Sequence, residues 1–143
     1  MSTKPTQILY RTQVTATSGR DGGVKSQDGI LELGLAMPKE LGGNGAKLTN
    51  PEQLFAAGYA ACFLSAMKFV ASQTKLALPS TADVTAEVGI GPSPVGFGLE
   101  VALTVQLPGV PEDVATQLLE RAHQVCPYSN ATRNNIDVSI RLA

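Results

Sequence analysis

The spacing of hydrophobic positions changes along the chain, and each change predicts a change of secondary structure. Apolar and polar residues alternate over residues 7–17, 24–26 and 31–35, which predicts three strands. Nearly every residue from Leu54 to Met67 is apolar or small, which predicts a central helix over residues 50–73. Further strands are expected at 84–90, 97–107 and 136–142, and a helix with one apolar stripe from Pro111 to Cys126.

This order, βββ–α–ββ–α–β, predicts an α+β fold in which helices pack against sheet. A glycine-rich turn is expected at 18–23 and a Pro/Gly loop at 37–49. The second helix should end near Cys126 because a proline follows it. Tyr128, Asn130, Arg133 and Asn134 are typical of a polar loop leading to the last strand. No linker divides the chain, so we expect a single domain over residues 1–143.

The central helix has clear start signals and little polar surface. Asn50 is a good N-cap, Pro51 suits the first helical position, and Glu52 suits the positive end of the helix dipole. Lys68 ends the apolar run after about 14 residues, short of the roughly 20 that a membrane span needs. A helix that is apolar all round is expected to be buried on all sides. We therefore expect an oligomer that helps to bury it, and no membrane partner.

Composition and residue spacing argue against several classes of function. The 143 residues carry a net charge of −1, without the basic patch that nucleic-acid binding needs. The first 20 residues lack the pattern of a signal peptide, which favours a cytoplasmic location. There are two cysteines, Cys62 and Cys126, and one histidine, His123, without the spacing typical of a metal site.

Two thiols, one arginine and one carboxylate are the candidates for chemistry. A thiol reacts as the thiolate, and Cys62 in an apolar helix would need a nearby cation to ionise. Arg20 in the glycine turn could supply that charge, and Glu52 could orient Arg20. Each residue also has an ordinary explanation. Buried free cysteines are common, an arginine in a turn is usually solvated, and an acid suits the first turn of a helix.

Five segments together cover nearly the whole chain and resemble the organic hydroperoxide resistance (Ohr) proteins, a branch of the Ohr/OsmC family. The motifs AACF and VCPYSNATR are specific and stand in the family's order. The segments are SGRDG (18–22), ELGGNG (40–45), NPEQLFAAGYAACF (50–63), GIGPSPVGFGLEV (89–101) and AHQVCPYSNATRNNIDV (122–138).

The resemblance implies an OsmC-like fold in an intertwined homodimer and a thiol-dependent peroxidase that converts organic hydroperoxides, including those of fatty acids, to alcohols. Cys62 matches the peroxidatic cysteine and Cys126 the resolving cysteine. Arg20 and Glu52 match the pair that activates Cys62. No bound cofactor is implied. The disulfide between the two cysteines would be reduced by dihydrolipoyl groups, on lipoylated proteins or as dihydrolipoamide.

The residues agree with this chemistry, because a sulfenic acid on one thiol condenses with a second thiol to a disulfide. An apolar wall that includes Leu54, Phe55, Phe63 and Phe97 is expected to favour apolar hydroperoxides. Two alternatives stay open. One is an OsmC-type peroxidase of broader substrate range. The other is a non-catalytic dimer that binds a hydrophobic ligand, with both cysteines merely buried.

Overall fold

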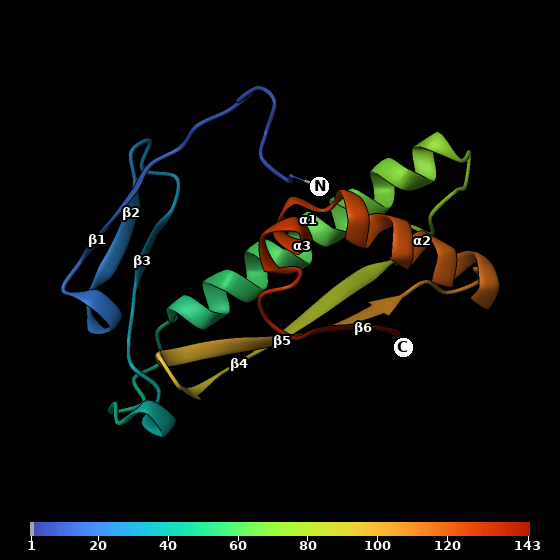
Figure 1. Ribbon diagram of the computed structural model, residues 1–143. Coiled ribbons are helices and arrows are strands. Elements are labelled where there is room, and N and C mark those ends of the chain that lie inside the picture. Colours follow the sequence, from blue (N-terminus) through green and yellow to red (C-terminus); the bar gives the residue numbers. More distant parts are fainter. Residues whose placement is uncertain (1) are drawn as a thin grey trace. The chain divides into compact units, whose positions relative to one another are not determined.

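The computed structural model describes residues 2–143, which form two compact units that divide between Leu54 and Phe55 (Figure 1). Within these described residues, two three-stranded sheets and three α-helices confirm the predicted α+β class. The elements are β1 (Val14–Thr17), β2 (Gly23–Ser26), β3 (Glu32–Gly34), α1 (Pro51–Gln73), β4 (Asp83–Ser93), β5 (Gly96–Gln106), α2 (Glu112–Val125), α3 (Pro127–Thr132) and β6 (Val138–Leu142).

The first unit is an antiparallel sheet in the order β1-β2-β3. The predicted strand over residues 7–17 is shorter in the structure, because β1 begins only at Val14. The register ends where Val14 lies opposite Ser26, the last residue of β2. Ser26 accepts and donates hydrogen bonds that turn the chain toward β3. One more backbone hydrogen bond, from the N–H of Gln27 to the carbonyl of Gln13, extends this pairing. Among the described residues, no strand pairs with residues 7–12.

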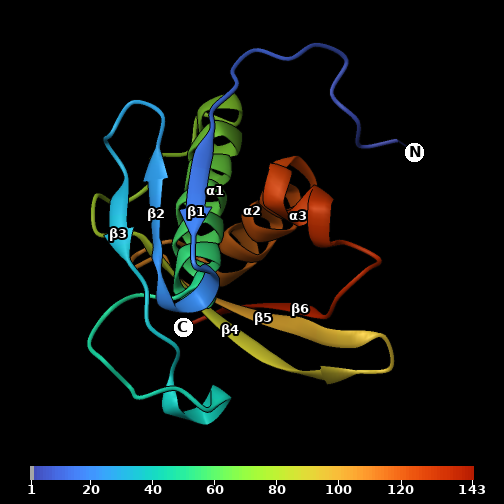
Figure 2. The same ribbon diagram turned by 90° about the vertical axis from the view of Figure 1, so that its left-hand side faces the viewer.

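The second unit has its three helices on one face of the sheet β4-β5-β6 (Figures 1 and 2). β4 and β5 form a long antiparallel hairpin that is closed by two residues, with Ser93 opposite Gly96. β6 pairs parallel to β5, so α2 and α3 form the crossover between these two strands. The central strand presents Val101, Leu103 and Val105 to the helices, and all three are buried.

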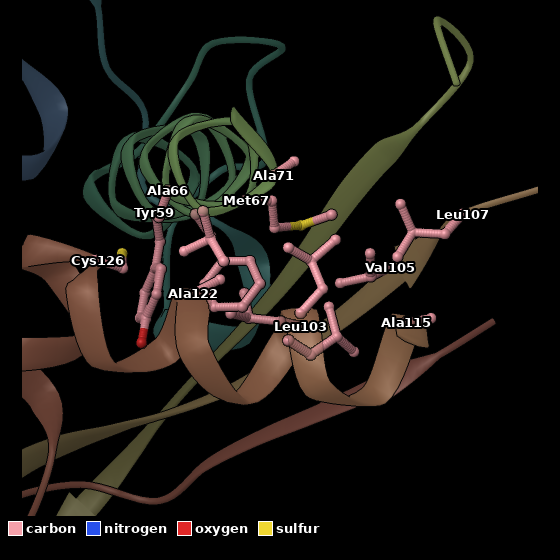
Figure 3. Close-up of a cluster of buried hydrophobic side chains, with 14 of the residues drawn as sticks. Tyr59, Ala66, Met67, Ala71, Leu103, Val105, Leu107, Ala115, Ala122 and Cys126 are labelled. Atoms are coloured by element: carbon pink, nitrogen blue, oxygen red, sulfur yellow. The ribbon is translucent and has the colours of Figure 1, made fainter. Parts of the chain in front are cut away.

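The helix α1 packs onto this sheet through one face. Its buried residues recur at the spacing of three and four that defines a helical stripe, and Figure 3 shows several of them with Leu103 and Val105 of β5. Although α1 is long and apolar enough to span a membrane, this packing is that of a core helix. The six buried residues are Tyr59, Phe63, Ala66, Met67, Val70 and Ala71.

The expectation that α1 is buried on all sides is not met within a single chain. Ala57 and Ala61 are exposed, and Phe69 keeps 53% of its surface exposed. Apolar composition predicts low water contact but does not specify what covers each face. The predicted oligomer remains a prediction.

The segment after Cys126 corrects a second expectation. Residues 127–132 form the short helix α3 rather than a polar loop. Pro127 occupies the first helical position, where its missing N–H costs nothing and its fixed φ favours the helix. The predicted end of α2 is confirmed, because the helix stops at Val125 and Cys126 adopts an extended conformation.

Candidate active site

The turn between β1 and β2 presents Arg20. It consists of a short 3-10 helix, Gly19–Asp21, followed by Gly22. Gly19 has a left-handed φ of 73°. A Cβ at Gly22 would lie 1.8 Å from the carbonyl oxygen of Thr17, so any other residue would force this turn to shift. The glycines therefore shape the loop that carries Arg20.

The start of α1 presents Glu52. Asn50 caps the helix as predicted, since its Oδ1 accepts a hydrogen bond of 2.8 Å from the N–H of Gln53. Glu52 lies in the first turn of α1, where the helix dipole favours a negative charge. The cap fixes the start of α1, and the helix dipole stabilises the negative charge of Glu52 there.

Arg20 and Glu52 form a bidentate ion pair within the first unit. Nη1 of Arg20 donates to Oε2 of Glu52 at 2.8 Å, and Nη2 donates to Oε1 at 2.6 Å. The hydrogen bonds from Arg20 lower the pKa of Glu52, and those to Glu52 raise the pKa of Arg20. A guanidinium has five N–H donors, so the pair leaves donors of Arg20 for a further anion.

Cys62 and Cys126 form a second pair, within the second unit. Cys62 lies in the middle of α1, and Cys126 lies at the bend between α2 and α3. The Cys126 thiol donates to Sγ of Cys62 across 3.5 Å, and both thiols are free. Cys126 is fully buried and Cys62 is partly exposed, so Cys62 is the thiol that a solute meets first.

The surroundings of Cys62 keep it protonated unless a cation is supplied. Burial raises the pKa of Cys62 to about 11, a backbone hydrogen bond from Tyr128 opposes this rise, and the neighbouring Cys126 sulfur adds to it. At pH 7 a thiol of that pKa is ionised in roughly one molecule in 10⁴. The second unit by itself therefore brings the two thiols together without lowering the pKa of Cys62.

Tyr128 of α3 is a contact of Cys62 that the sequence did not indicate. Its ring packs against Phe55 and Tyr59 of α1 at centroid distances of 6.2 and 5.8 Å. A Cβ at Gly58 would lie 2.7 Å from the Tyr128 hydroxyl, so the glycine leaves room for this ring. Pro127 directly after the cysteine was the available signal for a helix here.

An apolar cavity of about 560 Å³ lies within the second unit, beside α3 and the β4–β5 hairpin. Tyr128 lines this cavity, and its backbone makes a hydrogen bond to Cys62. Two of the four residues expected in an apolar wall, Phe55 and Phe97, line it. Phe63 does not, because it is fully buried in the core.

The structure thus groups the four predicted residues into two pairs. Glu52 and Cys62 both lie on α1, which is continuous from Pro51 to Gln73. Within the described part of the chain, no group of three or more His, Cys, Asp or Glu side chains could hold a metal ion. His123, on α2, has its Nδ1 buried without a hydrogen-bond partner in that same part of the chain.

Comparison with known proteins places the chain in a family. Residues 43–141 match the family model described as OsmC-like protein. The organic hydroperoxide resistance protein of Xanthomonas axonopodis pv. citri is 54% identical over 139 residues, which cover 97% of this chain and 98% of that protein.

Two solved structures show the same fold at similar identity. One is a putative organic hydroperoxide resistance protein from Vibrio cholerae O1 biovar eltor with captopril bound in one of its active sites. It has a TM-score of 0.92 and 51% identity, covering 99% of this chain and 96% of that one. The other is the organic hydroperoxide resistance protein OsmC from Legionella pneumophila, with a TM-score of 0.91, 49% identity, and coverage of 96% and 99%. The chain therefore belongs to the OsmC-like family, in the branch of the organic hydroperoxide resistance (Ohr) proteins.

Proposed function

We propose that this protein protects against organic hydroperoxides by reducing them to alcohols in a thiol-dependent peroxidase reaction. The names of its relatives support the role in organic hydroperoxide resistance. The observation that carries the chemistry is the pair of free thiols, with sulfurs 3.5 Å apart and one partly exposed. The apolar cavity beside Tyr128 supports a preference for apolar hydroperoxides, including those of fatty acids.

The proposed reaction has two chemical steps. The Cys62 thiolate attacks the distal oxygen of the hydroperoxide, the O–O bond breaks, and the products are a Cys62 sulfenic acid and an alkoxide that takes up a proton. The Cys126 thiol then attacks the sulfenic sulfur, forming the Cys62–Cys126 disulfide and releasing water. Arg20, oriented by Glu52, stabilises the thiolate and the charge that develops on the alkoxide.

A dithiol must then return the disulfide to two thiols. We propose a dihydrolipoyl group, free or on a lipoylated protein, as this reductant, with no bound cofactor in the enzyme. Exchange through a mixed disulfide would convert the dihydrolipoyl group to lipoyl and restore Cys62 and Cys126. We also propose that the reaction takes place in the cytoplasm.

Steady-state turnover tests this function. We expect rapid consumption of cumene hydroperoxide and fatty-acid hydroperoxides with dihydrolipoamide, and slow consumption of hydrogen peroxide with thioredoxin. Equal rates with all peroxides would favour a peroxidase of broader range. The apolar cavity also suits a binding module, in which both thiols would survive an equimolar amount of organic hydroperoxide.

The geometry of α1 favours an active site shared between two chains. Glu52 and Cys62 are ten residues apart on one unbroken helix, which separates them by roughly 15 Å along its axis and about 80° around it. Side chains on one helix cannot easily close that gap. We therefore propose a homodimer in which the Arg20–Glu52 pair of one protomer activates Cys62 of its partner, across small exposed residues such as Ala57 and Ala61.

Mixing two inactive variants is expected to recover activity. In a mixed dimer of Glu52→Ala and Cys62→Ser chains, one shared site carries both defects and the other is intact. Random subunit exchange at equal concentrations should restore about a quarter of wild-type turnover, because half of the dimers have one of two sites working. Mass spectrometry verifies the mixed dimers. If proven mixed dimers stay inactive, Glu52 and Cys62 act within one chain.

A further inference from the structure

The position of Cys126 depends on how α3 is attached. Cys126 is the extended residue between α2 and α3, with φ −67° and ψ 122°. The helix α3 has six residues, too few to be stable without tertiary contacts. Whatever fixes α3 against α1 therefore also fixes the Cys126 sulfur relative to Cys62.

A buried hydroxyl cluster joins these same two segments. Oη of Tyr59, on α1, lies 2.8 Å from Oγ of Ser129 and 3.2 Å from Oγ1 of Thr132, both on α3. Tyr59 and Ser129 are 0% exposed and Thr132 is 6% exposed. In Figure 3 the Tyr59 ring extends from α1 with its hydroxyl directed away from that helix.

The hydroxyl contact and the sulfur contact are neighbouring connections between α1 and the start of α3. Tyr59 precedes Cys62 by three residues, and Ser129 follows Cys126 by three residues. Tyr59 and Cys62 therefore lie on adjacent turns of one face of α1, and Cys126 is the extended residue directly before the helix that carries Ser129. A displacement of α3 at Ser129 is therefore expected to move Cys126 as well.

Loss of the Tyr59 hydroxyl would remove the side-chain partner of Ser129, whereas Thr132 would keep its second hydrogen bond. Thr132 also donates to the carbonyl of Ser129 at 3.3 Å, so the cluster is internally connected. A buried hydroxyl without a partner costs more than the bond it loses, because it gave up water to enter the core. The simplest relief is a movement of α3 toward solvent, which carries Cys126 away from Cys62.

We propose that Tyr59 is a positioning residue that holds α3 so that Cys126 can capture an oxidised Cys62. This inference rests on the proposed function, because an oxidised Cys62 arises only if that thiol reacts with a hydroperoxide. The sulfurs must close from 3.5 Å to about 2.05 Å as the sulfenic acid and the Cys126 thiol form the disulfide and release water. A second hydroperoxide competes for the sulfenic acid, producing a sulfinic acid and an alcohol. By holding α3 in place, Tyr59 thus favours the disulfide over the sulfinic acid.

The variant Tyr59→Phe removes only the hydroxyl. Equilibration with mixtures of reduced and oxidised glutathione measures how readily the two thiols form a disulfide, without any peroxide. We expect this equilibrium to shift toward the reduced form by roughly tenfold, the scale of one buried hydrogen bond. With excess cumene hydroperoxide, mass spectrometry should show more sulfinic acid on Cys62 than in the wild type. Ser129→Ala breaks the same contact from α3 and should shift both results in the same direction.

A matched control separates positioning from general stability. Val70→Ala destabilises the same helix about three turns beyond Tyr59, at a residue that is 2% exposed. It should lower the melting temperature and leave the glutathione equilibrium unchanged. If folded Tyr59→Phe shows the same glutathione equilibrium as the wild type, the inference is overturned. If Tyr59→Phe does not fold, the same result in Ser129→Ala overturns it. A wild type that forms the disulfide with glutathione but consumes no hydroperoxide overturns the proposed function instead.

Discussion

Replacing Cys62 with serine is expected to abolish hydroperoxide consumption completely. A serine hydroxyl stays protonated at neutral pH and cannot act as the nucleophile toward the peroxide. The buried Cys126 is not expected to substitute for it, because it is 0% exposed. Peroxide loss measured by ferrous-ion oxidation checks the result. Ser65→Ala, an exposed change on the same helix, should keep full activity.

Replacing Cys126 with serine is expected to have a different effect from the Cys62 variant. The protein should react once, and the Cys62 sulfenic acid should then persist or be oxidised further, because no second thiol lies beside it. Mass spectrometry after one equivalent of hydroperoxide distinguishes these species. Sustained turnover in the Cys62→Ser variant would contradict the assignment of Cys62 as the reacting thiol.

Replacing Arg20 with alanine is expected to slow hydroperoxide reduction by about 10²-fold or more, the scale for losing one charge-stabilising donor. Without this cation the Cys62 thiol should keep the pKa of about 11 that its burial produces. The thiolate is the reactive form, so a raised pKa lowers the reactive fraction at neutral pH. Arg20→Lys should restore activity only in part, because an ammonium lacks the fork that binds two anions.

The rate of alkylation by iodoacetamide as a function of pH checks this mechanism. In Arg20→Ala the rate on Cys62 should keep rising toward pH 11, whereas in the wild type it should level off at lower pH. Arg11→Ala is a matched control, since Arg11 is an exposed arginine of the same unit. Identical pH profiles for wild type and Arg20→Ala would mean that another group activates the thiol.

The secondary structure was largely predictable because it follows from local periodicity. Alternation marked the strands, an apolar run marked α1, and the proline after Cys126 marked the end of α2. The errors occurred where the local pattern depends on distant partners. Residues 7–12 alternate like a strand, but β2 is too short to pair with them. A helix of six residues has too short a pattern to predict α3.

The candidate residues came from two sources in the sequence. Residue chemistry singled out Cys62, Cys126, Arg20 and Glu52 but left an ordinary explanation for each. The family motifs assigned their roles, which remain proposals. The structure added the bidentate Arg20–Glu52 pair and the close approach of the two sulfurs.

Composition and periodicity by themselves determined the order of the strands and of the two longer helices, the apolar character of α1 and the inventory of two thiols. Only the tertiary structure decided which side chains meet. Cys62 and Cys126 are 64 residues apart in sequence, and Tyr59 and Ser129 are 70 apart. Contacts of this kind depend on how separate elements pack, and no local pattern encodes a distance between them. The hydroxyl cluster beside the thiols therefore follows only from the packing of α3 on α1.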